Sequence, residues 1–372
     1  MRPGKSSGLL NLPPFFAAFT PLSINDTPDL SRIRRVLVTK LRHHGDVLLA
    51  SPVLGALKRH LPEAEIDALV YRDTRDMLAR HPALSQLHLV AKGGNLREEW
   101  RLLQSLRSRR YDLLVHLTSS SRGAWLARLL KPAVSVAPSH PGKLYRNSFT
   151  HLYRHANARP IVECNLDALR RIGLWPEEQD KKLVLVAGEE ADRSVAKHLR
   201  DLGLEAGKFI LIHPTSRWVF KCWPGEKVAE LARRLNEMGY PLLFSSGPDA
   251  QETGMVTGIL ARLSFNPPSL AGRLTLKELA AVLARARLFI GMDSAPMHMA
   301  AAVGTPVVAL FGPSGADIWG PWQVPSRVIT SEHTCRPCGF DGCGGSKRSD
   351  CLEIIPVERV LDATLELLEK TR

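Results

Sequence analysis

Residues 288–313 read LFIGMDSAPMHMAAAVGTPVVALFGP, and this stretch decides the fold class. It contains two short apolar runs, Leu288 to Ile290 and Val307 to Phe311, which are typical of buried strands. The run between them, Ala295 to Val303, is helical in pattern and carries Pro296 in its first turn, where proline is tolerated. A strand, a helix and a second strand predict one parallel crossover at the centre of a sheet.

The start of this crossover helix is a candidate ligand site. Its unpaired backbone N–H groups point to the crevice beyond the strand ends, where such folds bind ligands, and they suit a phosphate. Asp293 suits a hydroxyl or an amine, and His298 lies one turn into the helix. The alternative is that Ser294 only caps the helix and that His298 only packs in the core.

The rest of the chain alternates in the same way, in two halves. Apolar runs alternate with helical runs from residue 34 to residue 172, and again from residue 209 to a terminal helix at 357–370. This alternation predicts an α/β protein with two doubly wound domains facing a cleft. We expect a loose extension at residues 1–32, an N-terminal domain at 33–185 and a C-terminal domain at 186–372. The polar, basic and aromatic segment 139–159 suggests either a substrate-facing loop or a solvated one.

The composition points to an acidic partner. The chain has 50 Lys and Arg residues against 37 Asp and Glu residues, a formal net charge of +13. Such an excess suits nucleic acid, an anionic membrane or a phosphorylated substrate. Only 6% of the residues are aromatic and no stacking platform is visible, so we expect no nucleic-acid partner. No stretch reads as a signal peptide or a membrane span, so we expect a cytoplasmic protein.

Four of the six cysteines cluster near the C-terminus. Cys335, Cys338, Cys343 and Cys351 follow the spacing C-x2-C-x4-C-x7-C in a glycine-rich segment. Thiols at such spacing can hold a structural zinc ion. Reduced thiols or an opportunistic disulfide are the alternative, because the second pair is not spaced C-x2-C. In either case we expect no part in the chemistry.

Several phosphate-binding motifs are missing from the sequence. It contains neither G-x-G-x-x-G nor G-x-x-x-x-G-K-[ST], so a dinucleotide fingerprint and a P-loop are unsupported. No Asp-x-Asp pair is present to carry Mg²⁺ on a diphosphate. A metal-free enzyme must then neutralise a diphosphate with cations and helix N-termini. Lys221, in a polar loop expected to face the cleft, can supply such a charge.

Three motifs, each at a strand-to-helix junction, together resemble a known family. They are Leu41-Arg42-His43-His44-Gly45-Asp46-Val47, then Pro214-Thr215-Ser216 followed by Lys221-Cys222-Trp223-Pro224, and finally Asp293-Ser294-Ala295-Pro296-Met297-His298. In this order they are similar to the bacterial lipopolysaccharide heptosyltransferases, from about Arg34 to the C-terminus. The form His43-His44-Gly45-Asp46 looks most like the heptosyltransferase III type, which adds a side-branch heptose to the inner core.

The resemblance implies both a fold and an activity. The fold is the glycosyltransferase B fold, in which two Rossmann-like domains surround a cleft. The activity is an inverting, metal-independent transfer from an ADP-heptose that requires no cofactor. The implied acceptor, a phosphorylated glycolipid at the inner face of the cytoplasmic membrane, gives a use to the net charge and to the basic stretch Leu96 to Arg110. We therefore expect a protein that is peripheral to that anionic surface.

The resemblance also implies site residues. Asp46 would be the general base, and Arg42, His43, His44 and Gly45 would line the acceptor site. The donor site would comprise Thr215, Ser216 and Lys221 on the diphosphate, and Asp293, Ser294, Ala295 and His298 on the transferred sugar and phosphates. Glu252 is a loose match for a contact with the adenosine ribose. Two alternatives stay open at the first motif: Asp46 only caps a helix, or His43 or His44 is the base.

Physical chemistry supports such a minimal site. Inversion by one displacement needs one base on the acceptor hydroxyl and a stabilised leaving diphosphate. One carboxylate and one cation across a cleft satisfy both needs.

The sequence departs from the family pattern in one loop. The segment Trp218-Val219-Phe220 replaces a loop that is more acidic in the first and second heptosyltransferases. A different nucleotide-sugar donor or acceptor on the same fold is therefore the first alternative, and a non-catalytic basic protein that binds nucleic acid is the second.

Overall fold

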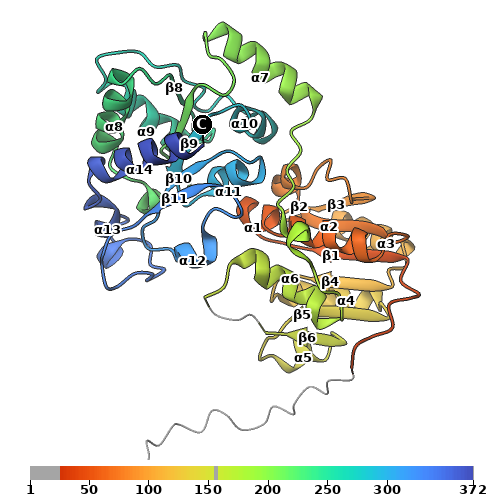
Figure 1. Cartoon of the computed structure of the whole chain (residues 1–372). Coiled ribbons are helices and arrows are strands. Elements are labelled where there is room, and N and C mark those ends of the chain that lie inside the picture. The colour runs from red at the N-terminus through yellow and green to blue at the C-terminus, as the bar shows by residue number, and fades with distance from the viewer. Residues whose placement is uncertain (1–25, 155–157, 372) are drawn as a thin grey trace, which may run out of the picture.

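The computed structural model describes residues 26–154 and 158–371, and two parallel sheets organise them (Figure 1). The first sheet has the strand order β3-β2-β1-β4-β5-β6, and the second has the order β11-β10-β9-β7-β8. Every strand pair in both sheets is parallel. The predicted α/β class with two doubly wound units is confirmed.

One or more helices separate each strand from the next along the described residues. The first half contains β1 (Arg35–Thr39), α1 (His44–Leu48), α2 (Ser51–His60), β2 (Glu65–Tyr71), the 3-10 helix η1 (Arg72–Met77), β3 (Gln86–Val90), α3 (Leu96–Ser108), β4 (Leu113–His116), α4 (Ser121–Leu130), β5 (Val134–Pro138), α5 (Lys143–Arg146), β6 (His151–Tyr153), α6 (Ile161–Arg171) and η2 (Glu178–Lys181). The second half contains α7 (Glu189–Asp201), β7 (Ile210–His213), η3 (Val219–Lys221), α8 (Gly225–Glu237), β8 (Leu242–Phe244), α9 (Ala250–Leu260), α10 (Leu276–Leu283), β9 (Leu288–Met292), α11 (Ala295–Ala302), β10 (Val307–Leu310), α12 (Ala316–Trp319), β11 (Ser326–Ile329), η4 (Cys343–Gly345), α13 (Asp350–Glu353) and α14 (Val357–Lys370).

The strand order places the ligand-binding crevices. In the first sheet the chain runs outward from β1 through β2 to β3 and then returns to β4, so the direction of winding reverses between β1 and β4. In the second sheet it reverses between β7 and β9. Loops at the carboxyl ends of strands splay apart at such a reversal and leave a crevice. The loops after β1, β7 and β9 carry the three motifs.

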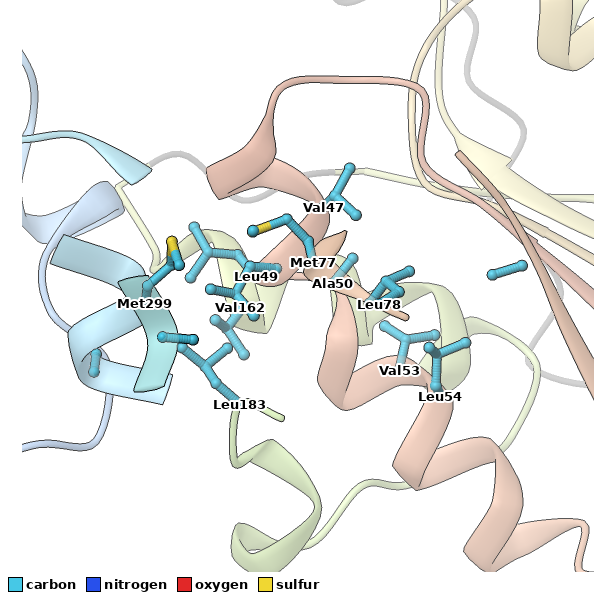
Figure 2. Packing of buried hydrophobic residues seen from close by; sticks show 14 of the residues in the cluster. Val47, Leu49, Ala50, Val53, Leu54, Met77, Leu78, Val162, Leu183 and Met299 are labelled. Atoms are coloured by element: carbon cyan, nitrogen blue, oxygen red, sulfur yellow. The ribbon is translucent and has the colours of Figure 1, made fainter. Parts of the chain in front are cut away.

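One hydrophobic cluster crosses from the first half to the second. Val47 and Leu49, at α1 and just after it, pack in the same cluster as Met299 of α11 and Leu183 of the connecting segment (Figure 2). Outside the cluster, the partly buried side chain of Lys277 on α10 donates to the carbonyl of Ala79 at 2.9 Å and to that of Val186 at 2.5 Å. Burial lowers the pKa of Lys277 to about 8. These contacts fix the orientation of the second sheet relative to the first.

Two local features of the chain have clear steric reasons. Strand β9 does not end at Gly291 but continues to Met292. A Cβ at Gly291 would lie 2.5 Å from Cζ of Phe289 and 3.0 Å from the carbonyl oxygen of His213, so the glycine permits close strand packing. The segment 44–60 forms two helices, because Pro52 in the first turn of α2 starts a new one.

Residues 26–32, expected as part of a loose extension, are tied to the first half. The side chain of Arg171 donates to both carboxylate oxygens of Asp26, at 2.9 and 2.6 Å. The ring of His151 bonds the carbonyl of Asp26 at 2.9 Å. The rest of that predicted extension, residues 1–25, lies outside the described residues. Within the described ranges, no helix is both long enough and apolar enough to cross a membrane.

Candidate active site

A cavity of about 1040 Å³ lies between the two halves and is lined from both. The first half contributes His43 to Asp46 and Asp76. The second half contributes, among others, Thr215, Ser216, Lys221, Glu252, Asp293, Ser294, Ala295 and His298. The structure therefore brings every predicted catalytic, donor-site and acceptor-site residue to one cavity except Arg42, which lies beside it.

Asp46 lies inside a helix and does not cap one. Helix α1 begins at His44, and the N-cap position is His43, whose side chain makes no capping hydrogen bond. The partly buried Asp46 carboxylate has its Oδ1 atom 4.0 Å from Nε of the exposed Arg42. The capping alternative is thus wrong, and the carboxylate faces the cavity with a loosely held cation beside it.

Gly45 brings the two walls of the cavity into contact. A Cβ at Gly45 would lie only 2.9 Å from Cδ2 of His298, which belongs to α11 on the other side. Real Cβ atoms almost never approach this closely. The absence of a side chain at Gly45 therefore lets the imidazole of His298 pack directly against α1, next to Asp46.

His298 is a buried, neutral histidine. Burial lowers the pKa of His298 to about 4, although the carboxylates of Asp293 and Asp46 raise it in part. Its Nδ1 atom is buried and has no hydrogen-bond partner among the described residues. A buried polar atom without a partner is costly, and a bound ligand would relieve this cost. The alternative of a fully satisfied core histidine does not fit this environment.

Lys221 and Asp293 form the charged centre of the second wall. The Lys221 ammonium donates to Oδ2 of Asp293 at 2.5 Å. Lys221 ends the short helix η3, and Asp293 follows β9, so residues 72 positions apart meet at the reversal between β7 and β9. The ammonium is partly exposed to the cavity, where it can meet an anion.

A second polar network lies behind this pair. The buried hydroxyl of Thr215 donates to Oε2 of Glu252 at 2.7 Å, and the backbone N–H of Gly247 donates to the same oxygen at 3.3 Å. The ring of His213 bonds the Ser245 hydroxyl at 2.9 Å, and burial lowers the pKa of His213 to about 4. Glu252 therefore fixes the loops after β7 and β8 while it lines the cavity.

The start of α11 keeps its backbone N–H groups available. Ser294 occupies the N-cap position, but its side chain makes no capping hydrogen bond. Its hydroxyl donates instead to the carbonyl of Met292 at 3.3 Å. The expectation that Ser294 only caps the helix is wrong, and the first turn of α11 opens onto the cavity through Ser294, Ala295 and Pro296.

Lys40 is a buried cation that the sequence reasoning missed. Its ammonium donates to the carbonyl of Leu117 at 3.0 Å and to Oδ1 of Asn165 at 2.9 Å. Burial lowers the pKa of Lys40 to about 8, and the nearby Asp46 carboxylate opposes that shift. The available signal was a lysine directly after an apolar strand. The lining residues Asp76 and Trp319 gave no comparable signal, because neither belongs to a motif.

With this geometry in place, comparison with known proteins decides the family. Residues 99–344 match the model of glycosyltransferase family 9 (heptosyltransferase). A lipopolysaccharide heptosyltransferase 3 of Escherichia coli K12 is 32% identical over 340 residues, which cover 88% of this chain and 96% of that one. The chain belongs to glycosyltransferase family 9. It is therefore a glycosyltransferase, and the resemblance drawn from its motifs is confirmed.

Solved structures agree on the glycosyltransferase B fold. A family 9 glycosyltransferase from Veillonella parvula superposes with a TM-score of 0.79 at 25% identity, covering 91% of this chain and 97% of that one. The E. coli heptosyltransferase WaaC with ADP-2-deoxy-2-fluoro heptose superposes with a TM-score of 0.67 at 18% identity, covering 91% of this chain and all of that one.

The described residues of the segment 139–159 lie away from the cavity of this family 9 member. It forms α5 and β6, and β6 extends the first sheet beside β5. The hydroxyl of Tyr145 donates to the carbonyl of Thr118 at 3.3 Å. Among the described residues of this segment, none lines the cavity. The substrate-facing interpretation is therefore not met, because the aromatic side chains of Tyr145 on α5 and Tyr153 on β6 are buried.

The cysteine cluster shows free thiols. Cys335, Cys338, Cys343 and Cys351 are all unpaired, and Cys351 is buried while Cys335 and Cys343 are exposed. In the ranges that the structure describes, no three His, Cys, Asp or Glu side chains are placed to hold a metal ion. The zinc interpretation gains no support from this arrangement, and the reduced-thiol alternative agrees with it.

Proposed function

We propose that this chain is an inverting, metal-independent heptosyltransferase that moves a heptose from an ADP-heptose to the inner core of lipopolysaccharide. The observation that carries the proposal is the single cavity that Asp46 lines from one side and the Lys221–Asp293 pair from the other. The ligand of the E. coli structure, ADP-2-deoxy-2-fluoro heptose, supports this donor. The name of the E. coli relative supports this acceptor.

The two domains have separate tasks in this proposal. The N-terminal domain, residues 33–185, binds the acceptor through Arg42, His43, His44 and Gly45. The C-terminal domain, residues 186–372, binds the nucleotide sugar. The division follows from the charges of the walls, because the second wall holds the partly exposed Lys221 and the free start of α11, and both suit a diphosphate.

Asp46 acts on the acceptor. Its carboxylate accepts the proton of the acceptor hydroxyl while the hydroxyl oxygen attacks the anomeric carbon of the donor. The bond between that carbon and the diphosphate breaks on the opposite face, so the configuration inverts and ADP leaves. Arg42, 4.0 Å from Asp46, is well placed to orient the carboxylate and to attract an acidic acceptor.

The second wall stabilises the leaving group. Lys221 offsets the charge that grows on the diphosphate, and Thr215, Ser216 and the first turn of α11 supply hydrogen bonds. When the diphosphate takes over the ammonium, Asp293 becomes available to a sugar hydroxyl. The unpartnered Nδ1 of His298 and the groups of Ser294 and Ala295 face the same space. Glu252 holds Thr215 in place and, in this proposal, borders the ribose.

The sequence and its net charge bear on the partners of the enzyme, and the proposed reaction requires no cofactor. The sequence lacks an Asp-x-Asp pair, so the cations named above carry the diphosphate charge in this proposal. The net charge of +13 suits a phosphorylated glycolipid and the anionic inner face of the cytoplasmic membrane, to which the protein associates peripherally. Nucleic acid is not a partner in this proposal.

The proposal is tested by transfer with purified protein. ADP-heptose and an inner-core acceptor that lacks the side-branch heptose are mixed, and the product is analysed by mass spectrometry and NMR. We expect one added heptose with inverted anomeric configuration, and the same rate in EDTA. GDP- and UDP-sugars serve as donor controls. Transfer from one of these but not from ADP-heptose, or activity that EDTA abolishes and Mg²⁺ restores, contradicts the proposal.

A further inference from the structure

A second, apolar cavity lies outside the active site, on the first half. It has a volume of about 450 Å³ and runs between α3 and α4. Its lining includes Leu96, Trp100 and Leu103 of α3 together with Trp125, Leu126 and Leu129 of α4. We call this surface the α3–α4 groove. The catalytic proposal uses none of these side chains.

The α3–α4 groove is rich in exposed apolar side chains. Leu96 is 89% exposed, Trp100 59% and Trp125 55%. Of the eleven large apolar residues that are exposed within the described ranges, five lie on α3, α4 and the adjoining α5. Contiguous exposed apolar patches on soluble proteins mark interaction sites. Tryptophan in particular is favoured where an apolar phase meets water.

The same region carries much of the positive charge of the molecule. Residues 95–146 contain ten Lys and Arg residues and only three Asp and Glu residues, which accounts for more than half of the net charge. Arg97, Arg101 and Arg107 are exposed on α3. Arg107 follows Trp100 by two helical turns and therefore shares its face. This combination suits an anionic partner with an apolar interior.

The acidic residues of the groove do not offset this charge. Glu99, which lines the groove, is bound by the guanidinium of Arg122 at 3.0 and 3.1 Å. This ion pair joins α3 to α4 and neutralises the carboxylate. Glu98 is the remaining acidic residue on α3, against three exposed arginines.

The groove is oriented toward the active site. Helices α3 and α4 follow parallel strands β3 and β4, so both begin at the edge of the sheet where Asp46 lies. Lys92, four residues before α3, donates to Oδ2 of Asp73 at 2.7 Å, and the ring of His44, which lines the active site, bonds the backbone carbonyl of Asp73 at 2.9 Å. A surface bound at the start of α3 and α4 is thus next to the acceptor side of the cleft.

We propose that the α3–α4 groove docks the protein on an anionic bilayer. Trp100, Trp125 and Leu96 enter the interface between headgroups and acyl chains, and Arg97, Arg101 and Arg107 engage acidic headgroups. The proposal rests on the proposed function for its biological setting, because a lipid-anchored acceptor would be presented beside the cleft. The docking itself needs no transfer and is measured without it.

Vesicle flotation with the full chain tests the docking. The vesicles contain phosphatidylglycerol and phosphatidylethanolamine, or phosphatidylcholine alone. We expect wild-type protein to bind the anionic vesicles, with an affinity that falls as salt rises, and not the neutral ones. The triple variant Arg97→Glu, Arg101→Glu, Arg107→Glu should bind about 100-fold more weakly or worse. The double variant Trp100→Ala, Trp125→Ala should lose about tenfold.

Two control variants distinguish an effect of the α3–α4 groove from the effect of any charge reversal or of any tryptophan removal. The variant Arg193→Glu, Lys197→Glu, Arg200→Glu makes the same charge change on exposed positions of α7. The variant Trp175→Ala removes another tryptophan, one that is 68% exposed. Both controls should bind like wild type, and all variants should keep the wild-type circular dichroism spectrum and melting temperature within a few degrees.

Three results would overturn the docking proposal. They are absence of wild-type binding to anionic vesicles at low salt, wild-type binding by the groove variants, and equal loss in the α7 control. If the groove is instead a contact between copies of this chain, sedimentation will show that the wild-type protein is a dimer and that the tryptophan variant is a monomer. The vesicle binding of that variant will then equal that of wild type. Transfer to a water-soluble, acyl-free acceptor is measured in parallel, so failure of docking and failure of the proposed transfer are distinguished.

Discussion

The two walls of the cleft differ in how firmly their polar groups are held. On the first wall, the Asp46 carboxylate has an exposed arginine 4.0 Å away. On the second wall, Nζ of Lys221 lies 2.5 Å from Oδ2 of Asp293, and the Thr215 hydroxyl lies 2.7 Å from Oε2 of Glu252. A prearranged wall suits a leaving group whose charge must be stabilised at once. A carboxylate without tight partners suits the acceptance of a proton.

Replacement of Asp46 should produce the largest effect and test the first wall. In Asp46→Asn the side chain keeps its shape but cannot accept a proton, so we expect the rate of transfer to fall about 10²- to 10⁴-fold. Donor affinity, measured by calorimetry with ADP, and the melting temperature should match wild type. The control Asp76→Asn changes another carboxylate of the same cavity and should cost at most a few-fold. Near-normal transfer by Asp46→Asn would move the base to His43 or His44.

Replacement of Lys221 should test the prearranged wall. In Lys221→Ala the diphosphate loses its cation as its charge increases, so kcat and donor affinity should both fall, with kcat about 10²-fold lower. Asp293, whose side chain is 7% exposed, is left without its ion-pair partner, so thermal stability should fall as well. The double variant Lys221→Ala, Asp293→Asn should regain thermal stability but not turnover. The control Lys208→Ala removes an exposed ion-paired lysine and should lower neither kcat nor thermal stability. Unchanged kcat in Lys221→Ala would contradict the assigned role.

Gly45→Ala should test the contact between the walls. The new Cβ would lie 2.9 Å from Cδ2 of His298, so the imidazole or the two helices α1 and α11 must shift. We expect kcat to fall about tenfold, since small displacements of reacting groups are costly. Gly55→Ala is the matched control, because a Cβ there meets nothing within 4 Å and alanine favours the helix. Equal activity of the two variants would show that the walls need not touch.

Acidification should lower the stability of the protein. Burial lowers the pKa of His213, behind the second wall, to about 4, and that of His116, behind the first, to about 3. The unfolded state takes up a proton near pH 6.5 and the folded state only below about 4. Stability is therefore complete above pH 6.5 and is lost as the pH falls toward 4, by about 2 kcal/mol per histidine at pH 5.

Melting curves at pH 7 and pH 5 measure this loss. The variants His213→Asn and His116→Gln should each reduce the difference between the two curves, because each removes one depressed histidine. If the melting curves at pH 7 and pH 5 differ as much in both variants as they do in wild type, other groups control the acid response. A difference reduced in only one variant would show that a single wall of the cleft controls it.

The sequence alone determined the fold class and which motifs lie together at one cavity. Apolar runs alternating with helical runs allow few structures other than wound parallel sheets, and motifs at strand ends must meet at the crevice edge. For this reason the motif around Asp46, the motif around Lys221 and the motif around Asp293 were predicted correctly to share a cavity. Sequence and motif order also sufficed for the family.

Only the tertiary structure decided the contacts made across long distances in sequence. The pairing of Lys221 with Asp293, the packing of Gly45 against His298 and the burial of Lys40 beside Asn165 join positions 72, 253 and 125 residues apart. Local pattern cannot encode such pairs, because each residue type has many ordinary uses. The exposure of Trp100 and Trp125, at 59% and 55%, was likewise decided by the tertiary structure, because a helical pattern does not tell which of its side chains other elements cover.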